Sequence, residues 1–527
     1  MVAVGSVVYQ PSVSISLISA AQPITNSAQR VLLVGQKTSA GSATDGQWVR
    51  DIGNANEEIA LFGRDSMLAE MVRTFKRYAP QVALDAIALA DHASGVARVS
   101  TIGITGTATA QGTILFRVSS DRRLFSLNVP SGEAAATTLA NAAVLLNADP
   151  ELPFNVTVVA TDLTFTAIND GTVANGLGLE VEGVVAGLTI GAVTISGGSA
   201  IAGSQDPVLS TALDVIGTTR YQGIVWPYAD ATEEVTELLD ARWNVTDQVL
   251  DGVAFTAKAD TYANLTGATY LTHADKNSLA LVAIADELQS ETGYKGPAVH
   301  EPPYVKATAL AAVRALRLTP DAPISRFLTT TKPADQYGGP HLASLPYFNT
   351  LLPELSVPRN GRGFTREEIE GVKTAGGAIL GQNVAGSALI AGEIVTTYLT
   401  NPSGAADVTW HYLNLVDTMS VAREYFQQNL RSIFAQSRLT EGVPIAGHDM
   451  ANADTIRGAM KKLYGDLSGA GFVLLQAGED AIRFFEDNLD VTLDPAQGKA
   501  TVACKALVVV QLRTFVITIQ VAFSTAG

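Results

Sequence analysis

The chain has 527 residues, of which 47% are hydrophobic and 16% charged, and its formal net charge is −16. At this length one hydrophobic core is excluded, and roughly three or four domains are expected. A protein that wraps nucleic acid is disfavoured, because such a protein needs a basic face. The charged fraction is low for a soluble domain, which predicts that other subunits cover much of the surface.

Cysteine content and hydropathy give two further expectations. The single cysteine, Cys504, excludes a disulfide framework and fits a reducing compartment. The first 29 residues carry no charge but lack a basic n-region and a solid apolar core, so no signal peptide is expected. No uncharged run is apolar enough to predict a membrane-spanning segment.

The N-terminal stretch predicts a strand on an extended arm. Ser12 to Leu17 alternates hydroxyl and aliphatic side chains, so Val13, Ile15 and Leu17 share one face. A polar segment, Ser19 to Gln29, follows it.

The next residues predict a compact α/β unit. Arg30 to Gly35 is an apolar run typical of a buried strand. Asp65 to Ala79 predicts an amphipathic helix with Asp65 as its N-cap and Pro80 as its stop. Val82 to Leu89 predicts the strand that completes the unit.

From about Val99 the composition changes to Gly, Thr, Ala and Val. Short alternating runs predict strands at Thr113 to Val118, Phe154 to Ala160 and Leu188 to Ile195, and the Ala-rich stretch Glu133 to Asn147 predicts a helix. This composition predicts a separate β-rich outer domain that folds by itself.

An α/β pattern then resumes. Strands are expected at Tyr221 to Pro227 and Gly252 to Ala257, and helices at Thr232 to Trp243, Lys276 to Glu291 and Tyr304 to Leu318.

The C-terminal block is mainly helical. It predicts paired strands at Ala388 to Leu399, helices at Leu413 to Gln436, Asp454 to Leu467 and Glu479 to Glu486, and a strand at Ala500 to Val510. On the second of these helices a buried stripe is expected at Ile456, Met460, Leu463 and Leu467, with Arg457, Lys461 and Lys462 off it.

The last stretch, Leu512 to Phe523, again alternates with a period of two. It places Phe515, Ile517, Ile519 and Val521 on one face. Both ends of the chain therefore look built to add strands to a sheet.

Motifs for catalysis are weak. A phosphate-binding loop needs Gly-x-x-x-x-Gly-Lys-Ser/Thr, but Gln36 precedes Lys37 and Val31 stands at the first glycine position, so an ordinary strand-end turn is the better interpretation. The six histidines are scattered without metal-ligand spacing. Cys504 lies in an alternating run and is expected to be a small buried residue. We expect no enzyme, no cofactor and no metal site.

The ordered features resemble the tail sheath proteins of Mu-like contractile-tailed phages, almost from end to end. The resemblance is carried by R-V-L-L-V-G-Q (Arg30 to Gln36), G-R-D-S-M-L-A-E-M-V-R-T-F (Gly63 to Phe75), N-A-D-P-E-L-P (Asn147 to Pro153), R-Y-Q-G-I-V-W-P-Y-A-D (Arg220 to Asp230), V-T-T-Y-L-T-N (Val395 to Asn401) and V-I-T-I-Q-V-A-F (Val516 to Phe523).

This resemblance implies a structural polymer. Sheath subunits of this family form stacked rings around an inner tail tube protein, link by strand exchange, and change from an extended to a contracted array that drives the tube through an envelope. It implies as partners copies of the chain, the tube protein, and baseplate and tail terminator proteins, without nucleic acid or membrane insertion. It also implies a virion component assembled in the bacterial host cytoplasm.

The residues agree with such a polymer. Strand-forming ends are devices for β-augmentation between chains, which assigns exchange to Val13, Ile15 and Leu17 and to the C-terminal face defined above. The hypothesis for Arg457, Lys461 and Lys462 is that they face an acidic tube, and the alternative is a solvated helix face.

The fold class expected is α+β or mixed α/β with several domains. The expected parts are an arm (1–29), an α/β segment (30–99), a β-rich outer insertion (100–203), an α/β middle domain (204–340), an inner tube-facing domain (341–511) and a C-terminal strand (512–527). Alternative functions are the sheath of a tailocin or contractile injection system and, in other classes, a β-rich extracellular adhesin or an α/β enzyme.

Overall fold

The structure is a computed structural model of the chain. It describes residues 28–53, 56–119, 123–191, 193, 201–245, 248–267, 270–271, 278–287, 301–328, 336–356, 364–383, 385, 389–445, 448–469 and 471–510.

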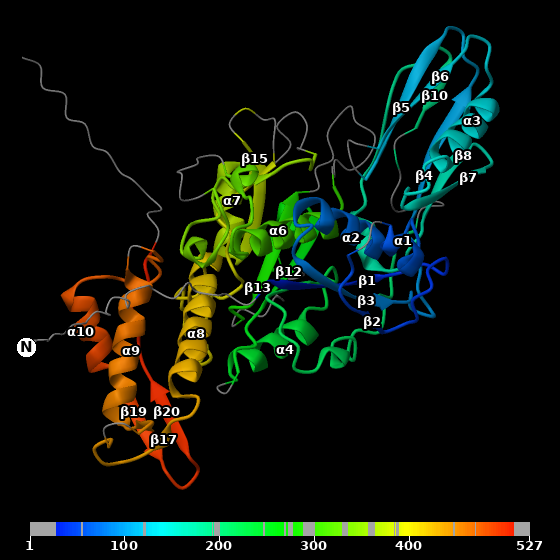
Figure 1. Ribbon diagram of the computed structural model, residues 1–527. Coiled ribbons are helices and arrows are strands. Elements are labelled where there is room, and N and C mark those ends of the chain that lie inside the picture. Colours follow the sequence, from blue (N-terminus) through cyan, green and yellow to red (C-terminus); the bar gives the residue numbers. More distant parts are fainter. Residues whose placement is uncertain are drawn as a thin grey trace, which may run out of the picture.

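A nine-stranded sheet forms the body of the molecule (Figure 1). Its order is β14-β16-β15-β13-β12-β11-β1-β3-β2, and the six strands from β15 to β3 run parallel. The strands are β1 (Arg30–Gln36), β2 (Gln47–Val49), β3 (Ala83–Leu89), β11 (Gly223–Val225), β12 (Val253–Asp260), β13 (Leu281–Glu287), β14 (Leu351–Leu352), β15 (Gly377–Gln382) and β16 (Leu389–Ala391). The body therefore joins strands from three of the segments that the sequence separates.

Helices cover both faces of this sheet. On one face α2 (Met67–Tyr78) and α6 (Pro303–Leu318) lie side by side, and α4 (Glu233–Trp243) lies on the opposite side (Figure 1). The shorter helices α1 (Glu57–Phe62), α5 (Tyr262–Thr266) and α7 (Arg366–Thr374) complete the body. Because both faces are covered, the central strands are continuously apolar, as in β1, whose residues Val31 to Val34 are fully buried.

Two predictions for the body are wrong. The segment Lys276 to Glu291, predicted as a helix, contains strand β13, which pairs with β12 and β15. A run of Ala and Leu favours a helix locally, but a buried parallel strand has the same apolar character. The N-cap of α2 is Ser66 rather than Asp65, because the Ser66 hydroxyl accepts the Ala69 N–H at 3.1 Å.

A long insertion between β3 and β11 projects from the body (Figure 1). We call residues 99–191 the lobe. It consists of the sheet β10-β4-β8-β7, the sheet β6-β5-β9 and one helix, with antiparallel pairing throughout. Its elements are β4 (Val99–Gly106), β5 (Gly112–Val118), β6 (Leu124–Val129), α3 (Ala135–Asn147), β7 (Phe154–Val159), β8 (Asp162–Ala167), β9 (Leu179–Glu182) and β10 (Leu188–Ile190).

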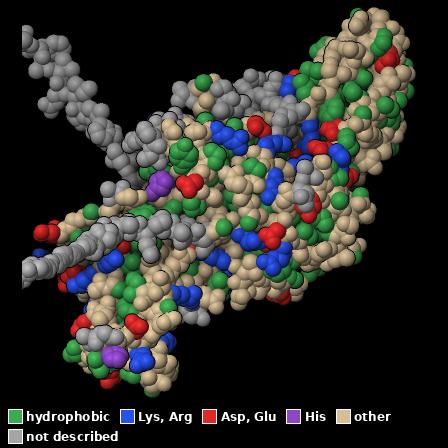
Figure 2. Space-filling model, in the orientation of Figure 1, with side chains coloured by type: hydrophobic (Ala, Val, Ile, Leu, Met, Phe, Trp, Pro, Cys, Tyr) green, Lys and Arg blue, Asp and Glu red, His purple; other side chains and the backbone are tan. Residues whose placement is uncertain are grey.

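Glycines close the far end of the lobe. Gly187 has a φ of +85°, and a Cβ atom there would lie 2.2 Å from the Thr107 carbonyl oxygen. Figure 2 shows few charged side chains toward this end and more at the base of the lobe. The boundaries 100–203 of an autonomous domain remain a prediction.

The long helix α8 (Leu413–Phe434) leads from the body to a second hydrophobic cluster. We call residues 435–510 the C-terminal module. It contains α9 (Ala453–Ser468), α10 (Glu479–Asp487), the short pair β17 (Arg438–Leu439) and β18 (Met450–Ala451), and the antiparallel pair β19 (Asp490–Asp494) and β20 (Lys499–Ala503). Tyr464 and Phe485 stack in its core, with their ring centroids 4.4 Å apart.

Two predictions near this region need correction. The paired strands expected over Ala388 to Leu399 reduce to β16 and an isolated bridge between Val395 and Tyr412. Cys504 is exposed rather than buried, because β20 ends one residue before it.

The first half of α8 is fixed to the body by ion pairs. The Asp417 carboxylate has no exposed surface, and it accepts hydrogen bonds from Arg314 of α6 at 2.6 and 2.9 Å and from the Tyr347 hydroxyl at 2.5 Å. Arg220 binds Glu424 at 2.7 Å, and Arg423 binds Asp251 at 2.7 Å. Burial raises the pKa of Asp251 to about 6, although the charges of Arg423 and Arg220 oppose that shift.

We expect Asp417→Ala to destabilise the protein by about 3–5 kcal/mol, because it leaves the Arg314 guanidinium buried without its carboxylate. Urea unfolding followed by circular dichroism measures this loss. Asp480→Ala, at an exposed carboxylate of α10, is the control and should change the stability by less than about 1 kcal/mol. Equal midpoints for the two variants would contradict the prediction.

Candidate functional site

The residues predicted to take part in strand exchange lie outside the described residues. They are Val13, Ile15 and Leu17 near the N-terminus and Phe515, Ile517, Ile519 and Val521 near the C-terminus. Their role in exchange stays a prediction.

The helix predicted at Asp454 to Leu467 is confirmed as α9. Asn452 caps it, since its side chain accepts the Thr455 N–H at 2.9 Å while its own N–H donates to the Thr455 hydroxyl. The predicted buried stripe is also confirmed, and Tyr464 adds to it. The three basic residues lie off this stripe, with Lys461 and Lys462 exposed and Arg457 half-buried.

The basic residues of α9 differ in their partners. Arg457 pairs with Asp454 at 3.0 Å, and Lys461 pairs with Glu486 of α10 at 3.0 Å. Lys462 makes no ion pair within the described part of the chain. The surface is therefore a mixed one, in which Lys462 is the member most available to an acidic partner.

The C-terminal module carries a two-stranded sheet. The sequence predicted a strand that overlaps β20, but β19 was not predicted. β19 and β20 pair from Asp490–Ala503 to Asp494–Lys499 around a tight turn at residues 495–498. No third strand borders either of them among the described residues, and β20 is largely exposed. The signal was present, because two alternating runs flank the turn sequence D-P-A-Q-G.

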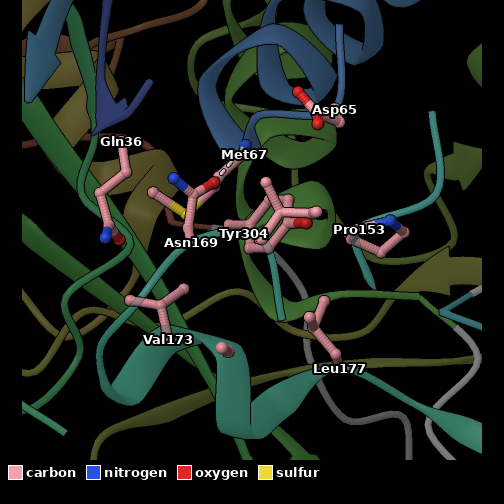
Figure 3. A pocket seen from close by; sticks show the side chains of 10 residues that line it. Gln36, Asp65, Met67, Pro153, Asn169, Val173, Leu177 and Tyr304 are labelled. Atoms are coloured by element: carbon pink, nitrogen blue, oxygen red, sulfur yellow. Dashed lines mark hydrogen bonds between the residues drawn. The ribbon is translucent and has the colours of Figure 1, made fainter. Parts of the chain in front are cut away.

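The crevice at the carboxyl ends of the parallel strands, where open α/β sheets usually bind ligands, is filled by the chain itself. The strand order reverses between β1 and β11. Asn169, which follows β8 of the lobe, lies there between Gln36 and Met67 (Figure 3). Its Oδ1 accepts the Met67 N–H at 3.0 Å, and its Nδ2 donates to the Lys37 carbonyl and to Asp91, both at 3.2 Å.

The Asn169 side chain lies where an anion such as phosphate would bind at the N-terminus of α2. Met67 is the first residue of α2, and a helix N-terminus is a ready-made phosphate site. Gln36 donates its amide to Asp91 at 2.6 Å and to the Asp170 carbonyl at 2.7 Å. Burial raises the pKa of Asp91, and the Asn169 and Gln36 amides oppose that rise. The Lys37 N–H donates to the Leu89 carbonyl at 2.9 Å, which fits a strand-end turn and not a phosphate loop.

A cavity of about 20 Å³ lies beside Asn169 (Figure 3). It is lined by largely apolar side chains, among them Met67, Pro153, Val173 and Leu177. This volume accommodates about one water molecule.

Charged side chains clamp the lobe to α2 next to this cavity. Arg123 of the lobe donates to Glu70 at 2.8 Å, and the Tyr304 hydroxyl of α6 donates to the other Glu70 oxygen at 2.7 Å. Burial alone would raise the pKa of Glu70, but the Arg123 charge and the Tyr304 hydrogen bond lower it overall. Arg64 and Arg73 of the body add contacts of 3.7 Å to Glu151.

The described residues contain no group of three or more His, Cys, Asp or Glu side chains placed to hold a metal ion. None of the helices that the structure describes is both long and apolar enough to span a bilayer.

Comparison with known proteins gives one strong similarity. The chain is 28% identical over 459 residues to the Mu-like prophage FluMu tail sheath protein of Haemophilus influenzae, and the match covers 84% of each chain. No protein-family model matches the chain.

Two solved structures are also similar. The sheath tail protein Lin1278 of Listeria innocua has a TM-score of 0.40 and 10% identity, with 92% of each chain covered. The helical sheath of the anti-feeding prophage in its contracted state has a TM-score of 0.42 and 11% identity, with 98% of this chain and 99% of that chain covered.

We expect Asn169→Ala to loosen the lobe from the body, because it removes the partners of the Met67 N–H and the Lys37 carbonyl. The expected loss is about 1–3 kcal/mol of local stability. Hydrogen exchange at the first turn of α2 measures it. Asn141→Ala, at an exposed position of α3, is the control and should leave this exchange unchanged; equal exchange in both variants would show that Asn169 does not hold the junction.

Proposed function

We propose that this chain, a tail sheath protein of the Mu-like kind, builds a contractile sheath by strand exchange. Each subunit completes the sheet of its neighbour with strands from the two chain ends. The subunits thereby form stacked rings around an inner tube protein, and contraction of the array drives that tube through the host envelope. The sheath is a virion component. Baseplate proteins lie at one of its ends and tail terminator proteins at the other.

The β19–β20 pair carries this proposal, because no third strand borders it among the described residues. The pair packs against α9, and an unpaired strand edge offers its backbone N–H and carbonyl groups to a strand from another chain. The terminal segments have the required pattern, with one aliphatic face in residues 12–17 and one apolar face, partly aromatic, in residues 512–523. Val509 lies beside Leu474, to which its N–H donates at 3.1 Å, so the chain leaves the C-terminal module close to its core.

Strand addition suits a sheath because it combines affinity with register. Main-chain hydrogen bonds supply affinity that is independent of sequence, and alternating side chains fix the register. A donated strand also acts as a tether, so rings remain connected while subunits rotate. The energy of contraction is supplied by packing differences between two states of the array.

The inner surface of the sheath includes α9 in this proposal. Lys462 is exposed and makes no ion pair among the described residues, so it is free to meet an acidic tube. Arg457 and Lys461 already pair within the subunit and contribute less. Such exposed contacts are weak and screened by salt, which suits a contact between sheath and tube that must break during contraction.

To test strand exchange we expect Val13→Ser, Ile15→Ser and Leu17→Ser together to leave a soluble folded subunit that forms no sheaths. The control replaces the opposite face, with Ser12→Ala, Ser14→Ala and Ser16→Ala, and should assemble normally.

Electron microscopy and circular dichroism measure both properties. A truncated chain beginning at Ser27 should behave like the apolar-face variant and melt close to the intact monomer. Sheaths of normal length from either variant would place the linkage elsewhere, and a markedly earlier melt would show that the arm packs within its own subunit.

For the inner surface we expect Lys462→Glu to lower co-sedimentation with the tube protein a few-fold at low salt, and less at high salt, since an exposed ion pair contributes about 0.2–1 kcal/mol. Arg483→Glu, which reverses an exposed charge on α10, is the control. Unchanged co-sedimentation of Lys462→Glu at low salt would remove α9 from the tube contact.

A further inference from the structure

A single side chain, that of Asn147, covers the outer edge of strand β7 in the lobe. Asn147, the last residue of α3, binds the middle of this strand with both ends of its amide. Its Oδ1 accepts the Val156 N–H at 3.0 Å, and its Nδ2 donates to the Val156 carbonyl at 2.7 Å. The side chain thus reproduces the pair of hydrogen bonds that a neighbouring strand would make.

The bonded groups lie on the outer edge of the sheet. β7 is the terminal strand of the order β10-β4-β8-β7, and Val156 stands opposite Phe165 of β8. In antiparallel pairing, a residue that sends its N–H and carbonyl away from one neighbour presents both on the other side. The backbone N–H and carbonyl of Val156 therefore point away from β8, and by the period of two those of Val158 do as well.

Strand β7 itself carries none of the usual protection of an edge strand. Edge strands are normally kept from pairing by charged residues, proline or bulges. The sequence of β7, F-N-V-T-V-V, contains none of these, and α3 carries no charge either. Five of its six residues have high β-propensity, Asn155 being the exception, and a segment of this kind without charge or proline matches the pattern of self-pairing segments. Val158 and Val159 are 39% and 56% exposed.

We propose that Asn147 keeps the β7 edge from pairing with the β7 edge of a second copy of this chain. A second copy is the natural partner, because two identical edges pair antiparallel about a twofold axis and no charge opposes them. The device matters most where many identical lobes are held close together, as in the sheath proposed above. It concerns the folded subunit, and its test requires no sheath.

The test compares three full-length variants in dilute solution. Asn147→Ala opens the edge, Asn141→Ala removes an exposed amide of the same helix as a control, and Asn147→Ala with Val158→Lys adds a charge that blocks the edge. We expect the first variant to reach about twice the monomer mass in light scattering as concentration rises. The other two should stay monomeric.

Hydrogen exchange locates the contact. In Asn147→Ala the amide of Val156 should exchange faster than in the parent chain at low concentration, because it loses its acceptor. The amides of Val156 and Val158 should both become protected as the dimer forms. A folded, monomeric Asn147→Ala at every concentration overturns the proposal. Association that Val158→Lys fails to suppress also overturns it, since it would reflect unfolding of the lobe. Failure of sheath assembly in the parent chain would refute the proposed function and leave this result intact.

Discussion

Helix α6 is buried along all of its 16 residues and still carries three cationic side chains, so the structure depends on satisfying those charges inside the protein. Lys306 pairs with Asp286 of β13, and Arg314 pairs with Asp417 of α8. Arg317 donates to three backbone carbonyls of residues 342–346. An unpaired buried charge is strongly destabilising, so each cation holds a different part of the chain in place. Through them α6 connects the sheet, α8 and the segment before β14.

Polar contacts join the remaining parts in a similar way. Asn169 and the Arg123–Glu70 pair hold the lobe at the point where open α/β sheets usually bind a ligand. The side chains of the lobe thus fill the crevice at the carboxyl ends of the parallel strands. The C-terminal module rests on its own hydrophobic cluster around α9, and its β19–β20 sheet has no third strand among the described residues.

Much of the candidate site was predictable where the signal is local. The stripe of α9 follows from helical periodicity, and the exposure of Lys462 follows from the same pattern. Asn169 and Asn147 carry no comparable signal, because each binds groups that other residues bring into position. The partners of Lys461 could not be predicted either, since Glu486 lies on another helix.

The sequence by itself determined the buried strands with continuous apolar runs, such as Val31 to Val34, and the amphipathic helices, because neighbouring side chains fix those periods. Only the tertiary structure decided that Leu281–Glu287 is a strand and that Cys504 is exposed. The physical reason is that an apolar run can be buried as a helix or as a strand. The choice is made by hydrogen bonds to β12 and β15, whose residues are distant in the chain.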